Sequence, residues 1–266
     1  MICFSNAKIN IGLNIIKKRK DRFHNIESVF YPIPLCDIIE IKEKKCFLFT
    51  SSGIYLKEEG NLCVKAFELV AKEFNIRPVH IHLHKIIPIG SGLGGGSSNA
   101  AFVLIMLNRI FNLRITLSSL QKIALKIGSD CPFFIINKPR FVTGKGNRFS
   151  KSMLNLKDKY LIIVCPKISV STELAYSKIH PLPSKNKLKN ISETSFANWK
   201  NNVTNDFENV TFNQHPEVKH VKEKLLTYKP EFTLMSGTGG SVYAFFNKEI
   251  DLKNQFDDFF YWGSWL

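Results

Sequence analysis

The segment PIGSGLGGGSSNAA, at residues 88–101, combines the residue types best suited to holding a phosphate chain. Its glycines leave the backbone N–H groups unshielded, and an uninterrupted apolar helical pattern follows directly after it. Bare N–H groups beside the positive end of a helix dipole form a natural binding site for an anion. The composition of this segment therefore indicates a phosphate-binding loop that runs into the start of a helix.

Three other interpretations of this segment compete with that one. The P-loop pattern requires Lys followed by Ser or Thr after its last glycine, but Ser97 and Ser98 occupy those positions here. A GxGxxG match at residues 90–95 fits a dinucleotide-binding loop, but that fold needs an acidic residue about 20 positions further on. No Asp or Glu occurs between Gly90 and Ser129. A flexible linker is disfavoured because an apolar helix follows at once, with Ser-Ser-Asn at its expected cap.

The charge of the chain is strongly basic. It has 37 Lys and Arg against 22 Asp and Glu, a formal net charge of +15 over 266 residues. Most of the basic residues are Lys, whereas reading nucleic acid would favour Arg, whose planar fork fits phosphate and guanine edges. We therefore expect charge spread over the surface and no nucleic acid partner, and keep a basic RNA-binding module as an alternative.

Nothing in the sequence suggests a membrane or secretion. No apolar run reaches the roughly 18 residues of a spanning helix, and the opening MICFSNAKIN lacks the pattern of a signal peptide. The six cysteines form no CxxC pair, which is typical of buried free thiols in a reduced compartment. We expect a cytoplasmic monomer or homodimer with no membrane partner.

The elements around the glycine-rich segment follow from its flanking periodicities. Period-two apolar patterns predict strands, and helical spacing with Asn61 as a cap predicts the first helix. The expected strands cover residues 2–16, 26–41 with a proline-marked bend, 46–52 and 79–88. The expected helices cover residues 62–74, 97–111 and 116–127, the last stopped by Gly128, and a further strand begins at residue 132.

The character of the chain changes after about residue 150. We expect a strand over 159–166, a helix over 171–179, a solvated connection over 184–190 and a helix that begins at Pro216. Strands over 232–236 and 241–246 flank a glycine turn, and an amphipathic helix ends the chain. This order predicts an α+β fold with two domains, residues 1–150 and 151–266.

Several segments in the same order resemble one family. They are the glycine-rich segment, the opening NAKINIGLNI, DRFHNIESVF, GSDCPFF and the late glycine turn at residues 236–240. Together they resemble the galactokinase, homoserine kinase, mevalonate kinase and phosphomevalonate kinase superfamily. Within it they look most like its kinases of non-mevalonate isoprenoid synthesis. The resemblance implies a two-domain small-molecule kinase, with a ribosomal-S5-like nucleotide domain and a C-terminal ferredoxin-like domain that completes the substrate cleft.

The resemblance also implies the roles of individual residues in phosphoryl transfer from ATP. Asp130 would accept the proton of the attacking hydroxyl, and Lys8 would hold Asp130 and stabilise developing charge. Mg²⁺ would be held mainly by the nucleotide, near Ser97 or Ser98, with no dedicated protein metal site. The ATP phosphates would be wrapped by Pro88, Ile89, Gly90, Ser91, Gly92, Leu93, Gly94, Gly95, Gly96, Ser97 and Ser98.

The acceptor implied by the resemblance is a cytidine diphosphate sugar alcohol. Phe23, His24 and Tyr176 would recognise the cytosine ring by stacking and hydrogen bonds, and Asn10 would contact the substrate beside Lys8. The family usually has Gly-Tyr before the histidine, whereas Arg22-Phe23 stands here. Phe keeps a stacking face but loses the hydroxyl, so base recognition departs from the family pattern.

Alternatives remain open at the level of the sequence. A sister kinase acting on mevalonate or homoserine is the nearest rival, and an oxidoreductase that uses the GxGxxG match is another. His80, His82 and His84 share one face of an expected strand and could bind a metal ion. Their spacing supplies no fourth ligand, so we expect them to line a polar face while the intervening apolar residues enter the core.

Overall fold

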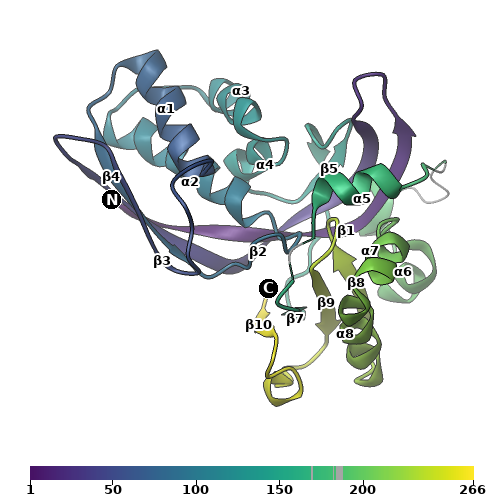
Figure 1. Ribbon diagram of the computed structural model, residues 1–266. Helices are drawn as coiled ribbons and strands as arrows, with labels where there is room; N and C mark the ends of the chain where they lie inside the picture. The colour runs from purple at the N-terminus through teal and green to yellow at the C-terminus, as the bar shows by residue number, and fades with distance from the viewer. Residues whose placement is uncertain (169, 182, 184–187) are drawn as a thin grey trace. The chain divides into compact units, whose positions relative to one another are not determined.

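A computed structural model of the protein describes residues 1–168, 170–181, 183 and 188–266 (Figure 1). The chain divides into two compact units. The first unit consists of Met1–Ala7, Leu35–Pro88 and Gly94–Lys138, and the second consists of Lys8–Pro34, Ile89–Leu93 and Pro139–Leu266. Both units use residues of two long strands, β1 (Ile2–Lys18) and β2 (His24–Glu43). These strands were expected, although the prolines of β2 do not interrupt it.

The first unit combines strands with a layer of helices. The strand β4 (Val79–Lys85) pairs in parallel with β3 (Leu48–Gly53) and antiparallel with the second half of β2. Its apolar side chains are buried and alternate with half-buried histidines. In Figure 1 the helices of this unit gather on one side of these strands. The helices are α1 (Leu62–Phe74), α2 (Gly95–Ile110), α3 (Leu117–Ile127) and α4 (Cys131–Ile136).

The ends of α1 and α3 are set by the residues that the sequence indicated. The side chain of Asn61 accepts a hydrogen bond of 2.9 Å from the backbone N–H of Cys63, and Thr116 accepts one of 3.2 Å from Ser119. Each bond satisfies a first-turn N–H group that has no partner within the helix. Gly128 ends α3, as predicted.

The strand predicted to begin at residue 132 is wrong, because these residues form the short helix α4. Pro132 lies in its first turn, where the fixed φ of proline favours a helix and its missing N–H group costs nothing. A run of adjacent apolar residues carries no periodicity that distinguishes a strand from a helix. Packing decides the structure here, since Phe133 and Phe134 are fully buried.

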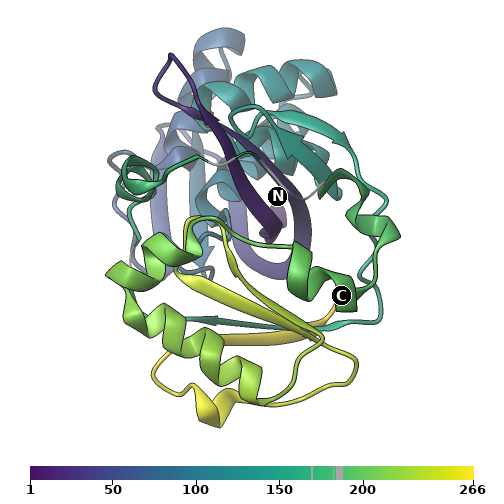
Figure 2. The same ribbon diagram turned by 90° about the vertical axis from the view of Figure 1, so that its right-hand side faces the viewer.

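The second unit contains an antiparallel sheet with the strand order β10-β7-β9-β8. The helix α8 (Pro216–Thr227) begins at Pro216, as predicted, and lies along this sheet in both views (Figures 1 and 2). The strands are β7 (Tyr160–Cys165), β8 (Phe232–Ser236), β9 (Ser241–Phe246) and β10 (Phe260–Trp265). Elsewhere in the unit β5 (Arg140–Thr143) pairs with the first half of β2 and with β6 (Arg148–Lys151).

The helix expected at the C-terminus is also wrong. The chain ends in β10, which pairs antiparallel with β7 from Phe260 opposite Cys165 to Trp265 opposite Tyr160. Aromatic residues fit a pleated, half-buried surface, which explains why this segment forms an edge strand. A short 3₁₀ turn, η2 (Lys253–Gln255), precedes it.

The remaining segments connect the sheet and helices of the second unit. The helix expected over 171–179 is confirmed as α5 (Thr172–Lys178), and α6 (Phe196–Asn202) and α7 (Glu208–Gln214) were not predicted. The connection expected over 184–190 lies in part outside the described residues, and its end forms the 3₁₀ helix η1 (Leu188–Glu193). Together the sheets and helices confirm the α+β class.

Two further expectations concern the cysteines and the membrane. Every cysteine is a free thiol; Cys63, Cys131 and Cys165 are buried as expected, whereas Cys46 is exposed. Burial raises the pKa of Cys63 to about 12, so this thiol stays protonated and unreactive.

Among the helices of the described residues, none has the length and apolar character required to cross a membrane.

Candidate active site

The glycine-rich segment ends in α2, which begins at Gly95, earlier than the sequence predicted. Its N-cap is Gly94, in the left-handed region at φ 70°. The Ser-Ser-Asn sequence therefore lies inside the helix, and its predicted position at the cap is wrong. Gly94 has no side chain with which to cap the first turn, whereas Ser or Asp would occupy an N–H group there. The start of α2 thus keeps the arrangement in which helix N–H groups bind an anion.

The loop tip, residues 89–93, belongs to the second unit and packs against the second glycine turn, residues 236–240. Gly92 has a φ of +78°, and a Cβ atom there would collide with the carbonyl oxygen of Ser236. A Cβ atom on Gly240 would lie 2.8 Å from a carbonyl oxygen of the loop tip. Glycine is required at these positions because the two backbones touch.

Lys8 lies on one face of β1 together with Asn10 and reaches the loop tip within the second unit. Lys8 is 3% exposed, and its Nζ donates a hydrogen bond of 2.9 Å to the carbonyl oxygen of Gly92 and another to Oδ1 of Asn10. The amide of Asn10 donates in turn to Oγ of Ser28 at 2.9 Å. The structure thus brings together a buried ammonium group, the loop tip and the predicted substrate residue Asn10.

Asp130 lies in the first unit as the N-cap residue of α4, and it is half-buried. Its turn lies beside the start of α2, since a Cβ atom on Gly128 would lie 4.0 Å from Oγ of Ser97. Within this unit the structure therefore brings the predicted base close to the N-terminal end of α2, where phosphate binding is predicted. Lys8 belongs to the other unit, so the meeting of Lys8 and Asp130 stays a prediction.

His24 and Tyr176, two of the predicted base-recognition residues, lie together in the second unit. Their ring centroids are 5.3 Å apart with an angle of 31° between the planes, and Tyr176 packs edge-on against Phe207 at 4.8 Å. Burial, followed by the positive charge of Lys18, lowers the pKa of His24. Near neutral pH the imidazole is therefore uncharged, with one nitrogen that donates a hydrogen bond and one that accepts.

Phe23, the third predicted base-recognition residue, has a different environment. It is 53% exposed, and Nζ of Lys145 lies 4.7 Å from the centroid of its ring. The preceding Arg22 has a positive φ of 66°, which fits the tight turn between β1 and β2. Phe23 thus presents an open aromatic face, backed by a cation, at the tip of this hairpin.

Asp37 is a structural residue of the site that the sequence analysis missed. It is fully buried in β2, and its Oδ1 accepts hydrogen bonds from the N–H groups of Ile86 and Ile87 at 2.7 and 2.8 Å. Its Oδ2 accepts from Nζ of Lys85 at 2.6 Å and from the amide of Asn99 at 2.9 Å. Asp37 therefore fixes both the entry to the glycine-rich segment and α2. The signal was a lone acidic residue in the apolar run PLCDII.

The three histidines of β4 form hydrogen bonds with hydroxyl groups of β3. Thr50 Oγ1 lies 2.7 Å from His80 and 2.8 Å from His82, and Ser52 Oγ lies 2.9 Å from His84. Within the described ranges, no group of three or more His, Cys, Asp or Glu residues could hold a metal ion. The intervening apolar residues are buried, so the expected polar face is confirmed.

Comparison with known protein families gives two matches. Residues 61–138 match the family described as "GHMP kinases N terminal domain", and residues 184–261 match "GHMP kinases C terminal". The first match includes the glycine-rich helix start and Asp130, and the second includes the second glycine turn.

Curated relatives and solved structures are similar over most of the chain. A 4-diphosphocytidyl-2-C-methyl-D-erythritol kinase of Parabacteroides distasonis is 45% identical over 270 residues and covers 100% of both chains. One of Porphyromonas gingivalis is 39% identical over 99% of both chains. A crystal structure of 4-(cytidine 5'-diphospho)-2C-methyl-D-erythritol kinase has a TM-score of 0.79 and 28% identity, covering 92% of this chain and 89% of its own. The mevalonate kinase of Methanococcus jannaschii, with a TM-score of 0.71, 18% identity and coverage of 99% and 97%, shares the fold.

Proposed function

The chain belongs to the GHMP kinase family, among its 4-diphosphocytidyl-2-C-methyl-D-erythritol kinases, and from this premise we propose its reaction and its site. The protein transfers the terminal phosphoryl group of ATP to the 2-hydroxyl of 4-diphosphocytidyl-2-C-methyl-D-erythritol, in non-mevalonate isoprenoid precursor synthesis. Similarity to curated relatives over the full chain favours this activity over a mevalonate or homoserine kinase and over an oxidoreductase.

The observation that carries this proposal is the position of Lys8. Its buried ammonium group is held at the loop tip by the carbonyl oxygen of Gly92 and beside Asn10. A fixed positive charge at a phosphate-binding loop stabilises the charge that develops during phosphoryl transfer, without reorganisation. Asn10 contacts the acceptor next to this charge.

Asp130 acts as the general base in this proposal. It accepts the proton of the 2-hydroxyl as the oxygen attacks the phosphorus, while the P–O bond to the leaving ADP breaks. Lys8 stabilises alkoxide character in the acceptor as its proton leaves. Residues 88–98, including the first turn of α2, bind the ATP phosphates through backbone N–H groups.

Mg²⁺ accompanies ATP, and the start of α2 fits such an ion. Among the residues that the structure describes, the buried Oγ of Ser98 has no hydrogen-bond partner, which a phosphate oxygen or a magnesium-bound water would satisfy. Ser97 lies in the same turn of the helix. When bound, Mg²⁺ neutralises charge on the phosphates and keeps most of its waters.

The cytosine ring is recognised by His24 and Tyr176, with Phe23 at the edge of the site. The two rings lie close enough to form one aromatic wall, and the neutral imidazole can hydrogen-bond to the base edge. Phe23 supplies a further stacking face, without the hydroxyl that the family usually has at this position.

The other parts of the proposal concern the setting of the enzyme. It acts in the cytoplasm as a monomer or homodimer, with a small-molecule substrate and with neither nucleic acid nor membrane as partner. The nucleotide and catalytic domain spans residues 1–150 and the α+β domain spans 151–266; the two family matches lie on either side of that boundary.

An ATP-consumption assay over several acceptors tests the proposal. We expect turnover with 4-diphosphocytidyl-2-C-methyl-D-erythritol and none above background with mevalonate or homoserine. Asp130→Asn and Lys8→Ala should each reduce kcat by at least about 100-fold, since general acid–base catalysis alone contributes about 100- to 10,000-fold. Undiminished turnover in both variants would refute the mechanism, and preferential use of another acceptor would refute the substrate.

A further inference from the structure

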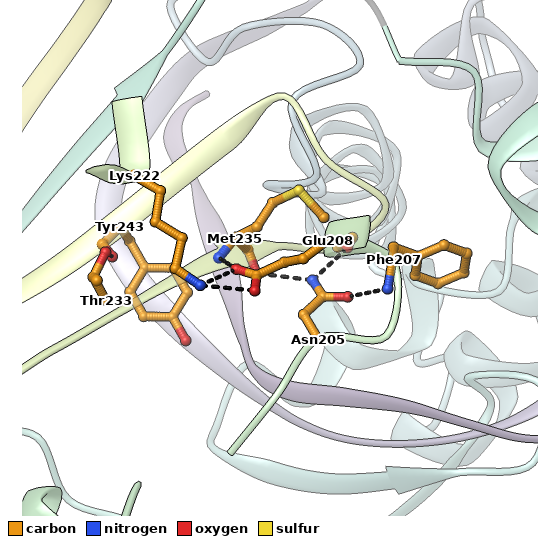
Figure 3. Close-up of polar contacts among 8 residues, drawn as sticks. Asn205, Phe207, Glu208, Lys222, Thr233, Met235 and Tyr243 are labelled. Carbon is orange, nitrogen blue, oxygen red and sulfur yellow. Dashed lines mark hydrogen bonds and ion pairs between the residues drawn. The ribbon is translucent and has the colours of Figure 1, made fainter. Parts of the chain in front are cut away.

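Side chains of α7, and of Asn205 just before this helix, form hydrogen bonds to the backbone of the second glycine turn and of the strand that leads into it (Figure 3). Asn205 is 4% exposed, and its amide donates hydrogen bonds of 2.9 Å to the carbonyl oxygen of Met235 and 2.8 Å to that of Gly237. Its Oδ1 accepts a hydrogen bond of 3.0 Å from the backbone N–H of Phe207. The buried side chain of Asn205 therefore forms hydrogen bonds both to the backbone at the second glycine turn and to the backbone at the start of α7.

Two residues of α7 form further hydrogen bonds to the turn and to Met235 just before it. Glu208 accepts a hydrogen bond of 3.0 Å from the backbone N–H of Met235, while Lys222 of α8 holds its carboxylate at 2.7 Å (Figure 3). Thr211 is 1% exposed and donates a hydrogen bond of 2.8 Å to the carbonyl oxygen of Thr238. The side chains thus contact the backbone at Met235, immediately before the turn, and at Gly237 and Thr238 within it.

The turn needs such external contacts because of its own composition. Gly237, Gly239 and Gly240 all have positive φ values of 62°, 123° and 93°. Glycine adopts many backbone conformations, so a run of glycines does not select one by itself. Hydrogen bonds from Asn205 and Thr211 to the turn carbonyls select the conformation that is observed.

Movement of the turn would be transmitted to the loop tip. A Cβ atom on Gly237 would lie 2.9 Å from Cα of Gly92, and Oγ of Ser236 donates a hydrogen bond of 3.1 Å to the carbonyl oxygen of Gly92. Two backbones in direct contact leave no side chain between them that could change rotamer and absorb a shift. The same carbonyl oxygen also holds Lys8.

We propose that Asn205 is a positioning residue for the nucleotide, assisted by Glu208 and Thr211. It fixes the second glycine turn, and the turn in turn fixes the loop tip in the conformation that binds the ATP phosphates. Asn205 itself does not contact ATP. This role rests on the proposed function only in taking residues 88–98 as the phosphate-binding segment.

The substitution Asn205→Asp tests this role with a minimal change of shape. A carboxylate keeps an acceptor for the N–H group of Phe207, so the aromatic packing of Phe207 on Tyr176 is preserved. It removes both donors to the turn and places negative charge against two carbonyl oxygens. We expect the Kd of ADP with Mg²⁺, measured by calorimetry, to rise about tenfold. The KM of ATP should rise similarly, and the KM of the acceptor should change less than twofold.

The pH profile separates positioning from a general loss of stability. The carboxyl group introduced by Asn205→Asp could, once protonated, donate one hydrogen bond to the turn again. The ADP affinity of this variant should therefore recover in part as pH is lowered from 8 to 6. The unmodified protein should show no such recovery. A deficit that does not change with pH in this variant would contradict the proposal.

A matched pair of Thr→Val substitutions controls for a variant that fails to fold. Thr211→Val removes one hydrogen bond to the turn. Thr233→Val removes a comparable buried bond of 2.8 Å to the carbonyl oxygen of Tyr243, within the sheet; both of these residues are labelled in Figure 3. We expect similar losses in Tm. The Kd of ADP should rise about three- to tenfold for Thr211→Val and less than twofold for Thr233→Val.

The outcomes distinguish this inference from the proposed function. Equal effects of the two Thr→Val substitutions, or unchanged ADP affinity in Asn205→Asp, would overturn the positioning role while leaving the kinase intact. An unmodified protein that binds no ADP would overturn the proposed function and this role together. Binding of ADP does not depend on the acceptor, so a wrong acceptor would leave the result valid.

Discussion

Replacing Asp37 with Asn removes one charge at the entry to the glycine-rich segment and keeps the shape of the side chain. An amide at this position can still accept the hydrogen bonds of Ile86 and Ile87. Its NH₂ group, however, faces the ammonium group of Lys85 and the amide of Asn99, which are both donors. Lys85, which is 4% exposed, thereby loses the carboxylate that balances its charge.

The cost of this substitution follows from the ionisation of Lys85. Burial lowers the pKa of Lys85, and Asp37 opposes that effect. Without Asp37 the pKa falls further, and the amine becomes neutral. For a lysine with an unfolded pKa of about 10.4, losing the proton at pH 7 costs at most about 4.6 kcal/mol, at about 1.36 kcal/mol per unit. Removing one partner of a buried pair typically costs about 3–5 kcal/mol, in agreement.

The sign of the pH dependence is fixed by proton binding. In Asp37→Asn the unfolded state binds a proton that the folded state does not, so stability rises with pH. The deficit from deprotonation should therefore shrink to at most about 1.9 kcal/mol at pH 9, which is only about 1.4 units below the pKa of lysine in the unfolded state.

Urea unfolding at pH 7 and pH 9, followed by far-ultraviolet circular dichroism, measures this deficit. The double variant Asp37→Asn/Lys85→Met should recover part of the stability at pH 7, because no buried amine remains. Its stability should also depend less on pH than that of the single variant. A deficit below about 1 kcal/mol at pH 7, or one that is equal at the two pH values, would refute the reasoning.

Three further predictions concern nucleotide and acceptor binding. Gly92→Ala forces a positive φ on alanine and a Cβ atom against Ser236, so the Kd of ADP should rise at least about tenfold; unchanged affinity would contradict the backbone contact. Tyr176→Ala should raise the KM of the cytidine diphosphate acceptor about five- to 150-fold, from about 1–3 kcal/mol of stacking, and an equal rise in the KM of ATP would argue against a role in base recognition. Because burial lowers the pKa of His24 below its usual value of about 6.5, acceptor binding should be nearly constant from pH 8 to 7 and weaken only at lower pH; binding that already weakens near pH 7.5 would be inconsistent with a neutral imidazole.

Local features of the fold were predictable from the sequence because they depend on neighbouring residues. The caps Asn61 and Thr116 and the helix start at Pro216 follow from side-chain and proline geometry within a few positions. Alternating burial along β4 follows from the two-residue period of a strand. The helix that follows the glycine-rich segment was predicted in the same way, and the binding of phosphate by that segment stays a prediction.

The errors arose where local pattern and packing disagree. Apolar residues at 132–136 became a helix because α2 and α3 bury them, and the aromatic C-terminus became a strand because β7 offers an edge for pairing. At the start of α2 the sequence offered several residues that can cap a helix. The chain used Gly94 instead, in a left-handed conformation that only the surrounding structure selects.

The sequence by itself indicated a phosphate-binding loop from the bare backbone of the glycine-rich segment, and its resemblance to a kinase family pointed to Lys8 and to an aromatic residue and an imidazole for a base. Only the tertiary structure decided which of them meet. It placed Lys8 within hydrogen-bonding distance of the carbonyl oxygen of Gly92 and packed the second glycine turn against the loop tip. It also placed Asn205, which is distant in sequence from the glycine-rich segment, in hydrogen-bonding contact with that turn. Hydrogen bonds between distant residues leave no periodicity in a sequence, because their energy depends on distance in space and not on spacing along the chain.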